Sequence, residues 1–141
     1  MRSVSLFLLS ALFVFSSCDD DTSEYVTVNV VTPKTMTLDA FRKSVEITSP
    51  KPIAESGKIY AYQNLVLIND VDKGIHIIDN SDPKNPVKTA FLSVLANRDM
   101  EIKGDYLYAD SLTDLLVFDI SDLNDITLVS RLTDVLQKYI P

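Results

Sequence analysis

By type and spacing, three sets of residues in this chain are candidates for chemistry. The one cysteine, Cys18, stands in the stretch FVFSSCDDDTSE, between an apolar run and three consecutive aspartates. Its thiol is a group that can be modified, oxidised or bound to a metal. The one histidine, His76, is the candidate general base. Asp70, Asp72 and Gly74 alternate as in part of a calcium loop, in which closely spaced carboxylates supply oxygen ligands.

The residues before Cys18 have the pattern of a secretory signal peptide. Arg2 supplies the positive charge, Val4 to Phe15 form an apolar stretch interrupted only by serines, and two further serines follow. A transmembrane helix needs about twenty apolar residues, and neither this stretch nor a later one reaches that length. We therefore predict that residues 1–17 are a signal peptide and that the chain is exported.

Cys18 and the small residues before it resemble the signal of bacterial lipoproteins. In that family the cysteine is acylated on its sulfur and becomes the new N-terminus. Phe15 stands here where an aliphatic residue is usual. The resemblance covers residues 1–18 and implies lipid attachment at Cys18 and anchoring to the outer membrane of the cell envelope. The alternative is a thiol left over in an ordinary signal peptide, although an unpaired thiol is a liability in an oxidising compartment.

The acidic residues after Cys18 predict a solvated tether over residues 18–24, because adjacent like charges repel and keep a segment extended. Asp19 to Asp21 are also similar to the acidic signals of Bacteroidetes lipoproteins that are displayed on the cell surface. Loss of residues 1–17 would remove Arg2 and no acid, so the net charge would change from −7 to −8. This charge, without a cluster of Lys and Arg, argues against nucleic acid as a partner.

The remaining candidates favour structure over catalysis. His76, between Ile75 and Ile77, is interpreted as a packed or rim residue, and a lone histidine excludes metal sites that need several imidazoles. The calcium interpretation is weakened by Lys73 at the third acidic position and by the lack of a closing glutamate. Asp and Ser side chains that bond backbone N–H groups in turns explain the same pattern. We predict no catalytic residue, no metal site and no cofactor.

The elements that must position these residues begin after the tether. In the segment 25–56, Tyr25 to Val30 alternate at period two and predict a strand. Thr37 is placed to cap a short helix over Leu38–Val45. Pro50 and Pro52 then predict an extended linker.

An internal repeat follows the linker. A shift of forty residues aligns Ile59–Leu92 with Asp99–Leu132 without a gap, and the apolar pattern coincides along both copies. The six identical pairs are Leu67 and Leu107, Asp70 and Asp110, Asp79 and Asp119, Ser81 and Ser121, Asp82 and Asp122, and Leu92 and Leu132.

Each copy contains four short β-prone runs separated by turn residues. They are Lys58–Tyr62, Leu65–Asn69, Ile75–Asp79 and Val87–Val94 in the first copy, and Met100–Ile102, Tyr106–Ala109, Leu115–Asp119 and Thr127–Leu132 in the second. Four antiparallel strands per forty residues are typical of a propeller blade. We therefore predict an all-β fold with two consecutive four-stranded antiparallel blades, 57–98 and 99–141, preceded by a short strand and a helix.

Several strands are apolar on both faces, which predicts that both faces are covered. Ile75 and Ile77 alternate with His76 and Ile78, so that neither face of that strand is polar. Stacking between neighbouring blades would cover such faces.

The turns IIDNSDPKNP and VFDISDLNDI resemble those of the LVIVP repeat family, whose members are β-propeller-like and often secreted or on microbial surfaces. The first copy has both expected prolines, Pro83 and Pro86, while the second has Leu123 and Ile126. The resemblance covers about residues 57–132 and implies a β-propeller-like architecture without indicating an activity.

Closed propellers need about four to eight blades, and the sequence holds two copies. We expect an incomplete propeller from a longer lipoprotein, the alternatives being two blades capped by the N-terminal elements or an assembly of several chains. Two functions stay open. One is a non-catalytic, lipid-anchored module that presents tyrosines such as Tyr62, Tyr106 and Tyr108 to an extracellular protein or glycan. The other is a fragment of a propeller enzyme, such as a hydrolase of glycans or peptides.

Overall fold

The computed structural model describes residues 35–136. The predicted signal peptide 1–17, Cys18, the tether 18–24, the strand over Tyr25–Val30 and the last five residues lie outside that range. Within it the fold is all-β, with the two consecutive four-stranded antiparallel units that were predicted, the first of which is extended to a five-stranded sheet by one further strand.

One short helix opens the described part of the chain. α2 spans Leu38–Lys43, and the Thr37 hydroxyl accepts a hydrogen bond from the Ala40 N–H at 3.1 Å, which satisfies one of the free donors at the helix start. Asp39 in the first turn and Arg42 and Lys43 in the last complement the helix dipole. The predicted cap is confirmed, and the helix ends two residues before the predicted Val45.

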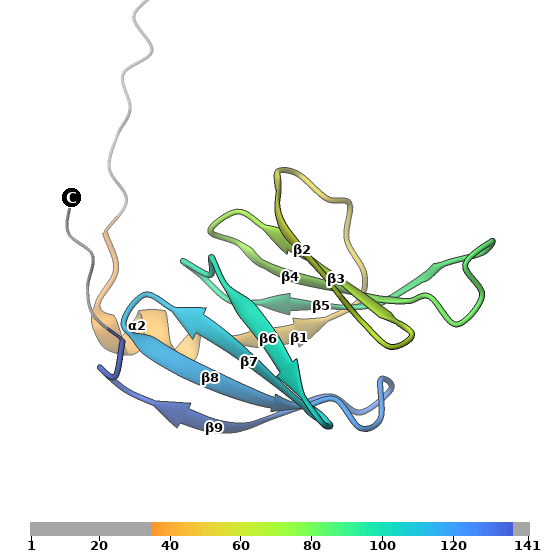
Figure 1. Cartoon of the computed structure of the whole chain (residues 1–141). Helices are drawn as coiled ribbons and strands as arrows, with labels where there is room; N and C mark the ends of the chain where they lie inside the picture. The colour runs from red at the N-terminus through yellow and green to blue at the C-terminus, as the bar shows by residue number, and fades with distance from the viewer. Residues whose placement is uncertain (1–34, 137–141) are drawn as a thin grey trace, which may run out of the picture. The chain divides into compact units, whose positions relative to one another are not determined.

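The first repeat forms a sheet in which each strand pairs with the next along the chain (Figure 1). We call these four strands blade 1: β2 (Ser56–Tyr62), β3 (Leu65–Asp70), β4 (Gly74–Asp79) and β5 (Val87–Ser93). A fifth strand, β1 (Glu46–Thr48), pairs with the free edge of β5. This strand was not predicted, and it joins the segment after α2 to blade 1.

The second repeat forms blade 2 with the same antiparallel order. Its strands are β6 (Met100–Lys103), β7 (Tyr106–Ser111), β8 (Asp114–Asp119) and β9 (Thr127–Leu132). The eight strands predicted for the two blades are all present, and their ends differ from the prediction by no more than two residues. Among the residues that the structure describes, β9 has no second neighbour.

The pairing registers correct the alignment of the two repeats. Leu67 lies opposite Ile77 in blade 1, whereas Tyr108, and not Leu107, lies opposite Val117 in blade 2. The β3–β4 turn has three residues, 71–73, and the β7–β8 turn has two, 112–113. The first two strands of each blade therefore correspond at an offset of 41 residues and the last two at 40. The gapless alignment was wrong over β2 and β3.

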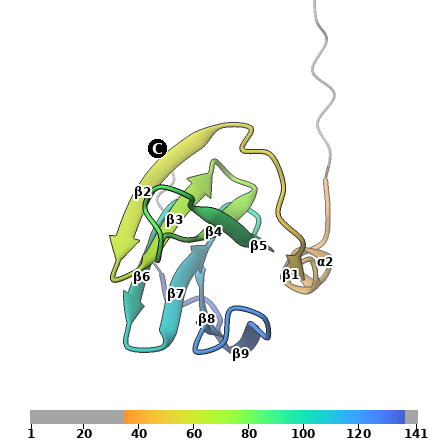
Figure 2. The ribbon, with the colours of Figure 1, turned by 90° about the vertical axis from the view of Figure 1, so that its right-hand side faces the viewer.

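The apolar core lies between the two sheets, and both blades contribute to it (Figure 2). Its fully buried members from blade 1 include Leu67, Ile75 and Ile77, and those from blade 2 include Leu107 and Phe118. Side chains alternate across a strand, so each blade has an inner face in this core and an outer face away from the other blade. Stacking thus covers one apolar face of each blade, whereas the prediction was that both faces are covered.

Candidate functional site

His76 is buried inside blade 1, in agreement with its interpretation as a packed residue. Its exposed fraction is 0%, and its ring centroid lies 4.6 Å from that of Phe91. Nε2 is 3.3 Å from an Asp70 carboxylate oxygen, while Nδ1 has no hydrogen-bond partner. A general base must come within hydrogen-bonding distance of the substrate proton, and a side chain without solvent exposure does not contact a substrate.

Asp70 fastens the linker to the end of β3. Its two carboxylate oxygens accept hydrogen bonds from the backbone N–H groups of Ala54 and Glu55, at 2.9 and 3.0 Å. Burial by itself raises the pKa of Asp70, but these two bonds, the His76 contact and the nearby Lys73 outweigh it and lower the pKa to about 2. The local turn predicted for Asp70 is therefore wrong, since its donors lie fifteen and sixteen residues away.

The turn role is confirmed for the aspartates of the second motif. Asp79 accepts from the Ser81 N–H at 2.8 Å, and Asp119 accepts from the Ser121 N–H at 2.9 Å. These bonds lower the pKa of Asp79 and of Asp119, with the Ser81 and Ser121 hydroxyl contacts as the largest cause. The following aspartate, Asp82, bonds the Lys84 N–H in the same way.

The candidate calcium positions are not brought together as ligands. Asp70 points to the linker backbone, and Asp72 lies beside Arg98, with 3.4 Å between Oδ1 and Nε. Within residues 35–136 no group of three or more His, Cys, Asp or Glu side chains is placed to hold a metal ion.

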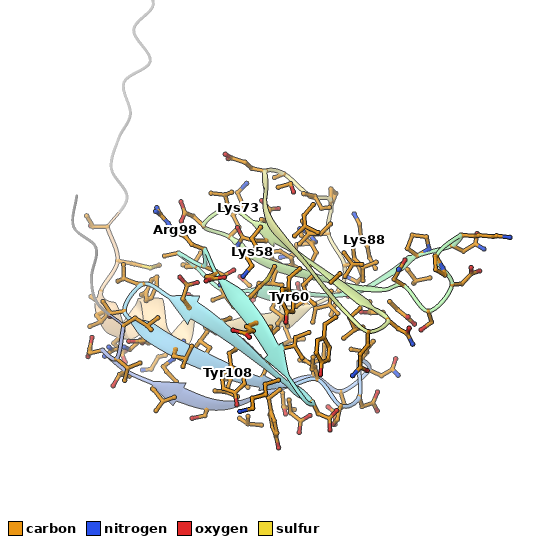
Figure 3. All side chains as sticks on the ribbon, viewed as in Figure 1. Lys58, Tyr60, Lys73, Lys88, Arg98 and Tyr108 are labelled. Carbon is orange, nitrogen blue, oxygen red and sulfur yellow. The ribbon has the colours of Figure 1, made fainter. Side chains whose placement is uncertain are left out.

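The three tyrosines considered for binding fall into two groups. Tyr62 is partly buried and packs against the core between the blades. Tyr106 and Tyr108 lie on β7 at every second residue, on the side opposite to the core residue Leu107, and Tyr106 is 43% exposed. Figure 3 shows Tyr60 between the two sheets and Tyr108 on the far side of blade 2.

Tyr108 belongs to a broader surface, the outer face of blade 2. The pairing registers place on this face Glu101, Tyr108, Val117 and Ser130 in one row, and Asp110, Leu115 and Leu132 in the next. A cavity of about 320 Å³ opens on it, lined by Asp99, Met100, Glu101, Tyr108, Asp110, Leu115 and Leu136. The face therefore combines apolar side chains, an aromatic ring and carboxylates.

Some of these carboxylates are committed to the fold. One oxygen of Asp110 accepts hydrogen bonds from the backbone N–H groups of Arg98 and Asp99 and from the Asn97 side chain. Asp99 pairs with Lys58 of blade 1, and this contact lowers the pKa of Asp99. The Glu101 side chain makes no hydrogen bond or ion pair among the described residues, so it is the carboxylate most available to a partner.

A second polar cluster, which sequence reasoning missed, ties α2 to blade 2. Asp114 at the start of β8 is 1% exposed. Its two carboxylate oxygens accept hydrogen bonds from the Arg42 guanidinium at 2.9 and 3.0 Å, and one of them accepts a further bond from Arg131 at 2.9 Å. The bond to Arg42 is the largest cause of a strongly lowered pKa of Asp114. Arg42 also meets Asp134 at 3.0 Å. The partners are far apart in sequence, and no local pattern pointed to them.

The two repeats match one protein family. The LVIVD repeat is found at residues 55–90 and again at 96–134, and together these matches cover more than half of the chain. The chain belongs to the LVIVD repeat family. The match corrects the resemblance inferred from the turns, which named the LVIVP repeat family.

The LVIVD matches begin 41 residues apart, as do the equivalent positions of β2 and β6 in the structure. No curated protein and no solved structure matches the chain. None of the helices in the described part of the LVIVD protein is long and apolar enough to cross a membrane.

Proposed function

We propose that this LVIVD protein is a non-catalytic interaction module, anchored to the outer membrane through acylated Cys18, that binds a partner through the outer face of blade 2. Residues 18–24, which include four acidic side chains, would serve as the tether between membrane and module. A single acyl chain gives marginal membrane binding, whereas two or three chains, at about 0.8 kcal/mol per buried methylene, give a stable anchor.

The observation that carries the proposal is the apolar character of a face that is only partly buried among residues 35–136. Tyr108, Leu115, Val117 and Leu132 correspond to the four blade 1 residues Leu67, Ile75, Ile77 and Leu92, each of which is 0% exposed between the blades. Of the blade 2 residues, Leu132 is 45% exposed, Tyr108 and Leu115 are half-buried, and Val117, in the middle of the sheet, is 8% exposed. Contiguous apolar surface framed by polar groups is characteristic of interaction sites.

Photo-crosslinking in cells tests the binding role. The full chain is expressed with a photoreactive phenylalanine analogue at position 108, and as a matched control at Lys84, an exposed turn residue of blade 1. We expect a discrete adduct from position 108 and none from position 84. If neither position, or both equally, give adducts, the outer face of blade 2 is not the binding surface.

Acyl labelling tests the anchor separately. Cells that express the wild type or Cys18→Ala are grown with radiolabelled palmitate, and the protein is recovered from the membrane fraction. We expect label in the wild type and none in Cys18→Ala, which should move to the soluble fraction. Label that persists in Cys18→Ala would contradict acylation at this residue.

A further inference from the structure

The outer faces of the two blades carry the same strand positions as the two inner faces that pack against each other in the core. The outer face of blade 2 corresponds position by position to the inner face of blade 1. The four pairs are Leu67 and Tyr108, Ile75 and Leu115, Ile77 and Val117, and Leu92 and Leu132. The inner face of blade 1 packs against blade 2. The outer face of blade 2 is therefore shaped by the same strand positions to receive a further blade.

The outer face of blade 1 corresponds in turn to the inner face of blade 2. Its rows contain Ile59, Ile68 and His76, and Ala61, Val66 and Ile78, which are the counterparts of Met100, Ala109, Leu116, Ile102, Leu107 and Phe118. All six counterparts in blade 2 are at most 4% exposed, whereas on blade 1 Ile59 of β2 is 62% exposed and His76 of β4 is 0% exposed. The outer face of blade 1 is therefore apolar and exposed at β2, whereas Lys51 of the linker lies over Phe91 of β5.

The outer face of blade 2 carries Glu101 and Asp110 beside one lysine, Lys103, so its excess charge is negative, whereas lysines lie on the outer face of blade 1. Glu101 and Asp99 border the cavity on blade 2. On the outer face of blade 1, Lys88 lies opposite Ile78 (Figure 3). The Lys51 ammonium lies 4.8 Å from the centre of the Phe91 ring. Complementary charge favours encounter and fixes the orientation of two surfaces.

The ion pair between Lys58 and Asp99 also indicates that a second copy could stack on blade 2. These residues occupy equivalent positions, directly before Ile59 and Met100, and their ion pair links blade 1 to blade 2. A second copy stacked on blade 2 would bring its Lys58 to Asp99 of the first copy. The contact between copies would again join opposite charges.

From these correspondences we propose that the protein self-associates head to tail, the outer face of blade 2 of one copy packing against the outer face of blade 1 of the next. The proposal rests on the proposed function, since it names the partner of the same face. The contact is heterologous, so successive copies either close a ring or extend in a row.

Sedimentation of two single-face variants tests the arrangement. All proteins are the full chain with Cys18→Ser, which removes the acylation site. Leu132→Lys alters the outer face of blade 2, and Ile59→Glu alters that of blade 1; both residues are at least 45% exposed, so the core is not disturbed. Circular dichroism confirms folding, and Tyr108→Ala serves as a second variant for blade 2.

We expect the parent to gain mass with concentration beyond one chain, and each variant to sediment as a monomer, with association weakened about tenfold or more. An equimolar mixture of Leu132→Lys and Ile59→Glu keeps one intact pair of faces and should form a dimer and nothing larger. Lys84→Glu, in an exposed turn, should behave as the parent.

Three results would overturn the head-to-tail contact. They are a parent that stays monomeric at the highest concentration, a single-face variant that still assembles, or a mixture that remains monomeric. A monomeric parent whose position 108 crosslinks to a different envelope component would retain the proposed function while removing this partner. Absence of any adduct from position 108 would remove both.

Discussion

At the scale of single residues, buried carboxylates hold together segments that are distant in sequence. Asp114 joins α2 and the end of β9 to the start of β8, and Asp70 joins the linker to the end of β3. Both side chains are nearly inaccessible to water. Buried charges are tolerated only where each is paired and hydrogen-bonded, and these two meet that condition.

Replacement of Asp114 by asparagine should destabilise the protein by about 3 kcal/mol, because it leaves two guanidinium groups without their buried partner. Urea unfolding of the full chain measures the change. The matched control is Asp39→Asn, whose ion pair with Lys43 is exposed on both sides and should matter by less than about 0.5 kcal/mol. Equal effects of the two substitutions would contradict the role of Asp114.

Asp70 predicts a loss of stability in acid. Its pKa is lowered from the ordinary 3.8 to about 2, so the folded state binds its proton less readily than the unfolded state. The stabilisation is complete above the unfolded pKa and is lost as the pH falls through the folded one. Unfolding by urea between about pH 4 and about pH 2 should show a smaller loss in Asp70→Asn than in the wild type. Parallel curves would count against this assignment.

At the scale of elements, strand patterns were read correctly where alternation and turn residues agree. The strands of both blades follow from runs such as those around Ile75 and Leu115. β1 was missed because three residues carry no periodic signal and their partner strand lies more than forty residues away. The gapless alignment failed because it matched Leu67 to Leu107, which is the same residue type. The residue that occupies the position of Leu67 in blade 2 is Tyr108.

Gly74, at the first position of β4, allows β4 to lie close to β5. Its φ is +151°, and a Cβ there would lie 2.0 Å from the Leu92 carbonyl oxygen of the neighbouring strand. Gly74→Ala should separate β4 from β5 and cost more than about 3 kcal/mol, or prevent folding. Gly104, at a φ of +62° with open space around it, is the control, and Gly104→Ala should cost about 1 kcal/mol. Thermal unfolding compares them, and a tolerated Gly74→Ala would mean that the pairing of β4 and β5 can adjust.

At the scale of the whole described domain, the two blades share one core and should unfold together. Phe118 of blade 2 is 0% exposed and lies in the same cluster as Leu67 and Ile77 of blade 1. The stacking of the sheets was predictable from strands apolar on both faces. The polar ties between α2 and blade 2 were not, because no short-range pattern specifies Arg42 as the partner of Asp114.

Phe118→Ala should lower the free energy of unfolding by about 3 to 5 kcal/mol. Because the core is shared, amide protection should fall in blade 1 as well as in blade 2, which hydrogen exchange measures residue by residue. Met36→Ala, at a side chain that is 55% exposed, is the control and should leave both blades protected. Loss of protection confined to blade 2 would show that the blades are independent.

The unequal turns between the middle strands tell how such a repeat can change in length. Both turns begin and end on a paired position, Asp70 with Gly74 and Ser111 with Asp114. A residue gained or lost at this tip changes the numbering downstream but not the side of the sheet on which each later side chain falls. Copies of the unit can thus diverge in length at one point while the surfaces through which they stack keep their composition.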